Sequence, residues 1–272
     1  MTCVMQGAFD ITCVRRDSGE TSIGPQAVSA PWHLSKPYWD GNVLLVQAVN
    51  ATAGIFAGDH LSMSVTVQSG ASVLLTSPSA SRIHTMPSGE ASLYQSVRID
   101  EGAWLEWMPE LFIPQNKSRY RQTTEVNAAP GARAYIVESL APGRVAHGEA
   151  FGFDQINWST TIRIGGKRVL AERFELRPDN ESLRDLSTPT AQRYTATALV
   201  IHPDPLPFRA WQQTVMDWQD DAVHIGGSQL ARGLYIFRIV TSSSESLKST
   251  LTRLRALLAD HIPLLRQSAR KL

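Results

Sequence analysis

Two glutamates on either side of an aromatic segment are the residues of this sequence whose types and spacing best suit acid–base chemistry. Glu106 and Glu110 lie in the run 104–110, which also holds two tryptophans. A spacing of four places both carboxylates on one face of a strand, provided that Pro109 keeps the register. Glycosidases use such a pair about 5–10 Å apart. Solvated strand residues opposite a buried tryptophan face, or a role in transfer or at an interface, are the alternatives.

A loop bounded by glycines, 143–149, brings three further side chains together, namely Arg144, His147 and Glu149. Loops on rigid scaffolds carry function disproportionately often. We therefore expect either charged groups at a polar face or pore, or a structural Arg–Glu pair near a bend.

Two more polar segments have both a structural and a functional interpretation. Glu172 and Arg173 follow a strongly apolar strand pair, so they form a buried ion pair or lie along a hydrated passage. Burying either charge without the other would be costly. The segment 77–82 is either a polar turn or a source of hydrogen-bonding or nucleophilic hydroxyl groups.

Several function classes are disfavoured by what the sequence lacks. It holds no phosphate-binding G-x-x-x-x-G-K-[ST] loop, no G-x-S-x-G elbow and no H-E-x-x-H helix motif. Its seven histidines are scattered singly, so a tight metal cage is not expected. The formal net charge of +1 also argues against a nucleic-acid partner.

Cysteine content and hydropathy indicate the compartment. Cys3 and Cys13 are the only two cysteines, too few for a disulfide framework, and the start of the chain is a poor secretion signal. The longest apolar stretch, 43–49, is far shorter than the roughly 20 residues that cross a bilayer. We expect a cytoplasmic protein with no membrane partner.

A repeated Gly-Ala strand start predicts the scaffold that positions these residues. Gly70, Gly102 and Gly131 lie 32 and 29 residues apart, and each separates two strand-like segments. A fixed period of this length is typical of stacked or coiled repeats. The predicted fold is mainly β, with stacked, β-helix-like short strands and a small C-terminal α+β element.

The composition changes sharply near residue 202. Three prolines between 203 and 207 interrupt any regular ladder. We predict a β-rich scaffold body over 1–201 and a small α+β element, packed on that body, over 208–272.

Local patterns within these parts predict individual elements. The aromatic segment 31–41 is expected to be a loop, and 181–186 and 208–218 are expected to be helices. Ser242 and Glu245 have the spacing of a capping box that opens a last, leucine-rich helix.

Six motifs follow one another with little gapping from about residue 40 to residue 177. Taken together, their order and spacing resemble those of the urease accessory protein UreD family, also called UreH. No single motif is specific by itself. The motifs are Ala53-Gly54-Ile55-Phe56-Ala57-Gly58-Asp59; Gly70-Ala71 with Leu75-Thr76-Ser77-Pro78-Ser79-Ala80; Gly102-Ala103-Trp104-Leu105-Glu106-Trp107-Met108-Pro109; Gly131-Ala132-Arg133; Gly143-Arg144 with Gly148-Glu149; and Glu172-Arg173.

The resemblance implies a non-enzymatic scaffold between apo-urease and a complex of two partners, the UreF-like protein and the GTPase UreG. It also implies that nickel moves through hydrated passages without a tightly bound cofactor, and that the chain forms a complex with UreF, as a dimer of heterodimers. Oxygen ligands and water suit an ion that must be released again.

By position, the resemblance carries over several family residues as candidates for a passage or a partner contact. Together with two neighbours they are Asp59, Glu106, Glu110, Arg144, His147, Glu149 and Glu172. Two alternatives stay open: a secreted-type β-solenoid enzyme that acts on polysaccharide, and a diverged UreD-like assembly module without a nickel role. The second arises because 51–54 and 82–86 depart from the family pattern.

Overall fold

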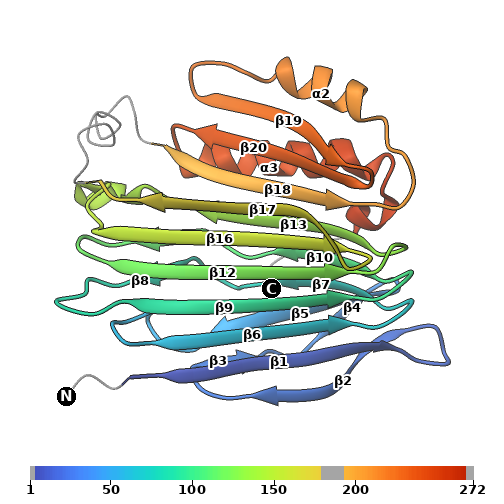
Figure 1. The fold of residues 1–272 in the computed structure, drawn as a ribbon, viewed down its shortest axis with the longest axis horizontal. Helices are drawn as coiled ribbons and strands as arrows, with labels where there is room; N and C mark the ends of the chain where they lie inside the picture. The colour runs from blue at the N-terminus through green and yellow to red at the C-terminus, as the bar shows by residue number, and fades with distance from the viewer. Residues whose placement is uncertain (1–3, 179–192, 268–272) are drawn as a thin grey trace.

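The chain folds into two large β-sheets that face each other. The computed structural model describes residues 4–178 and 193–267. Figure 1 shows the strands stacked like rungs, from β1 and β2 at the blue end to β18–β20 and two helices at the orange and red end. The predicted mainly β, stacked architecture is confirmed.

The seven-stranded sheet is parallel at its centre and antiparallel at both ends. Its spatial order is β17 (Lys167–Leu176), β16 (Gln155–Ile164), β12 (Arg119–Ala128), β9 (Ala91–Ile99), β6 (His60–Val67), β1 (Gln6–Arg15) and β2 (Thr21–Val28).

The eleven-stranded sheet lies opposite. Its main order is β19 (Val223–Ala231), β20 (Leu234–Thr241), β18 (Tyr194–Ile201), β13 (Arg133–Leu140), β10 (Trp104–Met108), β7 (Ser72–Thr76), β5 (Val43–Asn50) and β3 (Trp32–Leu34). Attached at its side are β4 (Tyr38–Asp40), β8 (Ser81–Ile83) and β11 (Phe112–Pro114). The remaining elements are β14 (Gly143–Arg144), η1 (Val145–His147), β15 (Glu149–Ala150), α2 (Phe208–Met216), α3 (Ser244–Ala259) and η3 (Pro263–Arg266).

The chain crosses from one sheet to the other at each predicted Gly-Ala turn. β6 leads into β7, β9 into β10 and β12 into β13, so each repeat is one strand of each sheet. Successive turns hydrogen-bond to one another: Trp104 N donates to Ala71 O at 2.9 Å, and Gly102 N donates to Gly131 O at 3.1 Å. The repeats therefore stack in register, turn upon turn.

Apolar side chains fill the space between the two sheets and the space between the eleven-stranded sheet and the helices. Alternation along the strands sends Leu105 and Ile136 into the space between the sheets, and sends Trp104 and Tyr135 toward the helices. Between the sheets lie two separate clusters, one around Leu105 and the other around Tyr120.

The segment after residue 207 joins the body directly. β19 and β20 continue the eleven-stranded sheet through β18, and α2 and α3 pack on that sheet's outer face. The predicted helix over 208–218 is confirmed as α2. The expected helix over 181–186 lies outside the described residues.

Two local predictions are wrong. The segment 31–41 holds strands β3 and β4, because both pair with the buried strand β5. The cap of α3 is Ser243, whose Oγ accepts from Ser246 N at 3.0 Å, so the helix begins one residue later than the expected capping box.

The antiparallel pairs at the ends of the sheets are irregular. Register shifts interrupt β1–β2, β16–β17 and β19–β20, and the edge strand β2 also carries Pro25. Among the described residues, no helix combines the length and the apolar character needed to cross a membrane.

The turn glycines generate a first prediction. Gly102 has φ +69° with open space where a Cβ would lie, whereas Gly131 does not have a positive φ. Since a left-handed residue with a side chain costs about 1–2 kcal/mol, Gly102→Ala should lower the free energy of unfolding by about that amount. Gly131→Ala, which displaces only part of the Glu101 side chain, should cost less. Urea denaturation measures both, and equal losses would contradict the assignment.

Candidate functional site: a polar belt between two pockets

A row of polar side chains crosses the otherwise apolar space between the sheets. In-register pairing places Gln95 beside Thr124, Thr124 beside Thr160, and Thr160 beside Glu172. Glu138 reaches the row from β13 of the opposite sheet. We call these five residues the polar belt.

Hydrogen bonds link most of the belt into a chain. Thr124 Oγ1 lies 3.0 Å from Gln95 Oε1 and 2.8 Å from Glu138 Oε1. Thr160 Oγ1 donates to Glu138 Oε2 at 2.8 Å. Gln122 adds a longer contact, with its Nε2 3.5 Å from Glu138 Oε1.

The Thr124 hydroxyl carries one proton but faces two carbonyl-type oxygens. Either Gln95 turns its NH₂ group toward Thr124 or Glu138 holds a proton of its own. Burial raises the pKa of Glu138, the hydrogen bonds from Thr160 and Thr124 oppose this shift, and the charge of Glu172 adds to it. The belt therefore holds a carboxyl group whose charge is disfavoured but stabilised by hydroxyl donors.

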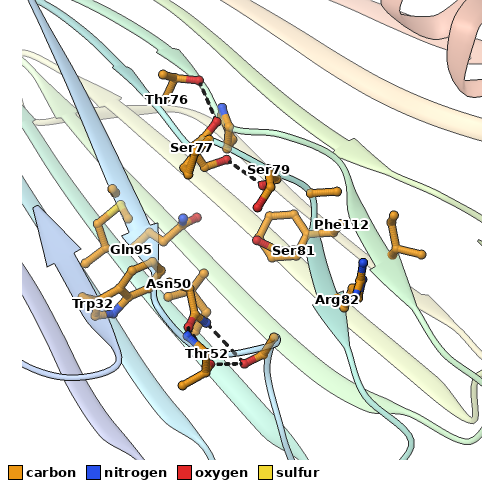
Figure 2. A pocket seen from close by; sticks show the side chains of 18 of the residues that line it. Trp32, Asn50, Thr52, Thr76, Ser77, Ser79, Ser81, Arg82, Gln95 and Phe112 are labelled. Atoms are coloured by element: carbon orange, nitrogen blue, oxygen red, sulfur yellow. Dashed lines mark hydrogen bonds between the residues drawn. The ribbon is translucent and has the colours of Figure 1, made fainter. Parts of the chain in front are cut away.

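One end of the belt opens into a cavity of about 340 Å³, which we call the hydroxyl pocket. Gln95 lies in its wall, and Trp32, Trp107 and Phe112 supply apolar surface. Figure 2 shows side chains converging on this space from several segments of the chain. The polar groups around it include Asn50, Thr52, Thr76, Ser77, Ser79, Ser81 and Arg82.

The other end of the belt meets a small cavity of about 30 Å³, which we call the Glu138 cavity. Its walls include Glu138, Thr160 and Glu172, together with Trp158 and Thr197. Such a volume is about the volume that one water molecule occupies in the liquid. The belt thus joins a roomy, hydroxyl-rich pocket to a tight acidic cavity through the core.

The structure places one of the predicted candidates, Glu172, on this belt. Glu172 lines the Glu138 cavity and accepts a hydrogen bond from Arg238 Nη1 at 2.6 Å. The expected pair with the neighbouring Arg173 does not form, because adjacent strand residues point to opposite faces. The link to Arg238 instead ties the last strand of one sheet to the other sheet.

Glu106 lies elsewhere, on the outer face of β10 beneath α3. It is fully buried, and both its carboxylate oxygens accept from Arg255, at 2.6 Å from Nε and 3.0 Å from Nη2. Burial raises the pKa of Glu106, and the guanidinium of Arg255 counteracts that shift. A glycan cannot reach this carboxylate.

Glu110 does not share a strand with Glu106, since β10 ends at Met108 before the proline. It lines an apolar groove of about 470 Å³ between the sheet and α3. The same-face arrangement that a glycosidase pair would need is therefore absent.

The loop candidates form a compact group of their own. Arg144 donates from Nε to Glu149 Oε2 at 2.8 Å and from Nη2 to Oε1. Glu149 also accepts from Asn116 N at 3.1 Å, and these contacts lower the pKa of Glu149. His147 is exposed at the end of η1. The Arg–Glu pair at a bend is present.

Asp59 closes the glycine loop and is almost fully buried. Its Oδ1 accepts from Met5 N at 3.1 Å and its Oδ2 accepts from Phe56 N at 2.8 Å. This carboxylate holds the loop 53–59 against the first strand.

No three His, Cys, Asp or Glu side chains gather as a metal site within residues 4–178 and 193–267. The belt offers mainly neutral oxygens and two carboxylates, which suits weak and reversible contact with a cation.

Comparison with known proteins settles the family. The model of the UreD urease accessory protein family matches residues 5–271. The urease accessory protein UreD of Opitutus terrae is 36% identical over 269 residues, which cover 98% of either chain. This chain belongs to the UreD urease accessory protein family. The resemblance of its ordered motifs is confirmed.

More distant relatives agree. The urease accessory protein UreD of Acetivibrio thermocellus is 28% identical over 242 residues, covering 88% of this chain and 92% of that protein. A UreD of Yersinia enterocolitica is 35% identical over 158 residues, covering 54% of this chain and 49% of its own length.

Sequence reasoning missed most of the belt of this UreD family member. Gln95, Thr124, Glu138 and Thr160 carry no motif. The available signal was alternation: in β12, Gln122 and Thr124 occupy the same inward phase as Tyr120 and Val126. Polar residues at inward-facing strand positions need hydrogen-bond partners inside the core, so they mark a candidate site.

The buried pair under α3 generates a second prediction. Arg255→Leu leaves Glu106 charged and uncompensated, so it should destabilise the fold by about 3–5 kcal/mol. Adding Glu106→Leu should restore part of the loss. The matched control is Arg253→Leu on the same helix, which gives up only a cation–π contact with Trp218 worth about 0.5–1 kcal/mol. Equal losses for the two arginine variants in denaturant titration would contradict this assignment.

Glu138 generates a prediction about pH. An unfolded glutamate titrates near about 4.3, and the folded pKa is raised, so the folded state binds the proton more tightly. The free energy of unfolding contributed by Glu138 therefore falls as pH rises from the unfolded value through the folded value. Glu138→Gln should remove this fall, so the variant gains stability relative to wild type with rising pH.

Unfolding curves at a series of pH values from about 4 to about 8 measure this difference. Thr161→Val, on the outer face of the same sheet, removes no titratable group and is the control, and its difference from wild type should lack this rise. A pH-independent difference for Glu138→Gln would show that the group does not titrate as stated.

Proposed function

We propose that this chain is a non-enzymatic scaffold of urease maturation which, with UreF-like and UreG-like partners, helps to deliver nickel to apo-urease. Membership of the UreD family supports the link to urease. The observation that carries the nickel part of the proposal is the polar belt, which sets a row of oxygen atoms across an apolar core.

The chemistry of the belt fits a cargo better than a resident metal. A bare cation in an apolar core would pay a large desolvation cost, so a route must offer oxygen atoms along its length. The hydroxyl pocket and Gln95 supply neutral oxygens, and Glu138 and Glu172 supply charge at the far end. Neutral oxygens bind nickel weakly, which allows release.

Passage along the belt requires side chains to turn aside. Thr124 stands between the hydroxyl pocket and Glu138, and its hydroxyl bonds to both neighbours. We propose that this threonine is the narrow point of the route and that Glu138 attracts the ion past it.

The partner scheme belongs to the same proposal. We propose a cytoplasmic complex with a UreF-like helical protein, as a dimer of heterodimers, with the nucleotide chemistry in the UreG-like partner. A diverged assembly module without a nickel role is the competing function. The departures at 51–54 and 82–86 favour it, because both segments border the hydroxyl pocket.

Two substitutions in the belt test the route. Thr124→Val keeps the side-chain shape but removes the hydroxyl, and Glu138→Gln keeps the side-chain shape and one acceptor oxygen but removes the charge. Each should lower nickel per urease several-fold in cells that co-express urease, its accessory proteins and the variant. Nickel is measured by mass spectrometry of purified urease.

Thr161→Val is the matched control, since Thr161 lies on the outer face of the same sheet. It should leave nickel loading unchanged, and all variants should co-purify with the UreF-like partner. Normal loading with both belt variants would remove the belt as the route. Loading that does not depend on this chain at all would favour the module without a nickel role.

A further inference from the structure

A third pocket, of about 390 Å³, lies beside the hydroxyl pocket and outside the belt. It is bounded by β8, β11 and the 143–147 segment, and by Tyr194 and Ser244 from the last part of the sheet and the start of α3. We call it the donor pocket, because most of the polar side chains in its wall are hydrogen-bond donors.

Arg82 is the first of these donors. Its side chain is exposed at the boundary between the donor pocket and the hydroxyl pocket. It forms no hydrogen bond and no ion pair with any residue that the structure describes. An arginine presents five N–H groups in a rigid fork that matches carboxylate and phosphate oxygens.

Gln115 is the second donor, and it lies in the wall of the same pocket. It is only 7% exposed, and its side-chain amide finds no hydrogen-bond partner among residues 4–178 and 193–267. The amide is not sealed from solvent, so it can bond to water or to a molecule in the pocket. Because Gln115 lines the donor pocket, a bound molecule there would satisfy it.

The charges around the pocket do not balance within it. None of the described residues that line it is acidic. Glu149, the partner of the lining residue Arg144, is engaged on both oxygens by Nε and Nη2 of that arginine. Arg144 still has Nη1 available and His147 adds a further polar group, whereas Tyr194 and Ser244 hydrogen-bond to each other.

We propose that the donor pocket binds an oxyanion, either a free small anion such as phosphate or a carboxylate carried by an acidic segment of a partner protein. The guanidinium of Arg82 and the amide of Gln115 hold the oxygens, and Arg144 and His147 supply further positive or donor groups. The donor pocket lies outside the polar belt, although Arg82 borders the hydroxyl pocket as well.

Titration calorimetry of the full chain tests the proposal at low ionic strength. The two probes are inorganic phosphate and a short peptide of four aspartates. For whichever probe binds, Arg82→Gln and Gln115→Leu should each weaken binding by about tenfold, which is the scale of one lost charge-assisted hydrogen bond. Circular dichroism checks that both variants stay folded.

Arg98→Gln is the matched control, because it removes the same charge as Arg82→Gln. Arg98 lies on the outer face of the seven-stranded sheet, where it pairs with Asp100 at 2.9 Å. It should bind as wild type does. Binding of phosphate identifies a small-anion site, and binding of the peptide without phosphate identifies a partner's carboxylate. Absence of binding by both probes, or equal weakening by Arg98→Gln, would overturn the proposal.

Discussion

In-register stacking of parallel strands is the constraint on which the rest of this structure depends. Each repeat sets its inward side chains directly beside those of the repeat before it, because the ladders between β6, β9, β12 and β16 contain no register shift. Apolar side chains therefore lie beside apolar ones, and polar side chains beside polar ones. Val65, Val97 and Val126 form one apolar row, and the polar row through Thr124 runs parallel to it.

This constraint explains how a polar row survives inside an apolar core. Side chains in one row are close enough to satisfy one another, so the cost of burying each polar group is offset by its neighbour. The row also needs a partner from the opposite sheet, and Glu138 provides it. A single polar residue out of step with this row would have no such partner.

The sequence predicts the repeats better than the site. The glycine spacing and the alternating strands specify the stacked coils, because these signals are local. Glu106 shows where local reasoning ends: its partner, Arg255, is 149 residues away in the sequence. The polar belt is hidden for the same reason, since its members come from five strands and only the register between them reveals the row. Glu172 was singled out from its place after an apolar strand pair and again through family likeness, and Glu138 was found through the structure alone.

The irregular strands at the two ends of the stack bear on how the protein behaves at high concentration. A coil of parallel strands could in principle extend from one molecule into the next, as cross-β fibres do. Pro25 in β2 removes a donor from one outer edge, and the bulge near Ala231 distorts β19 at the other. The outer edges of β2 and β19 are thereby poor templates for a further strand.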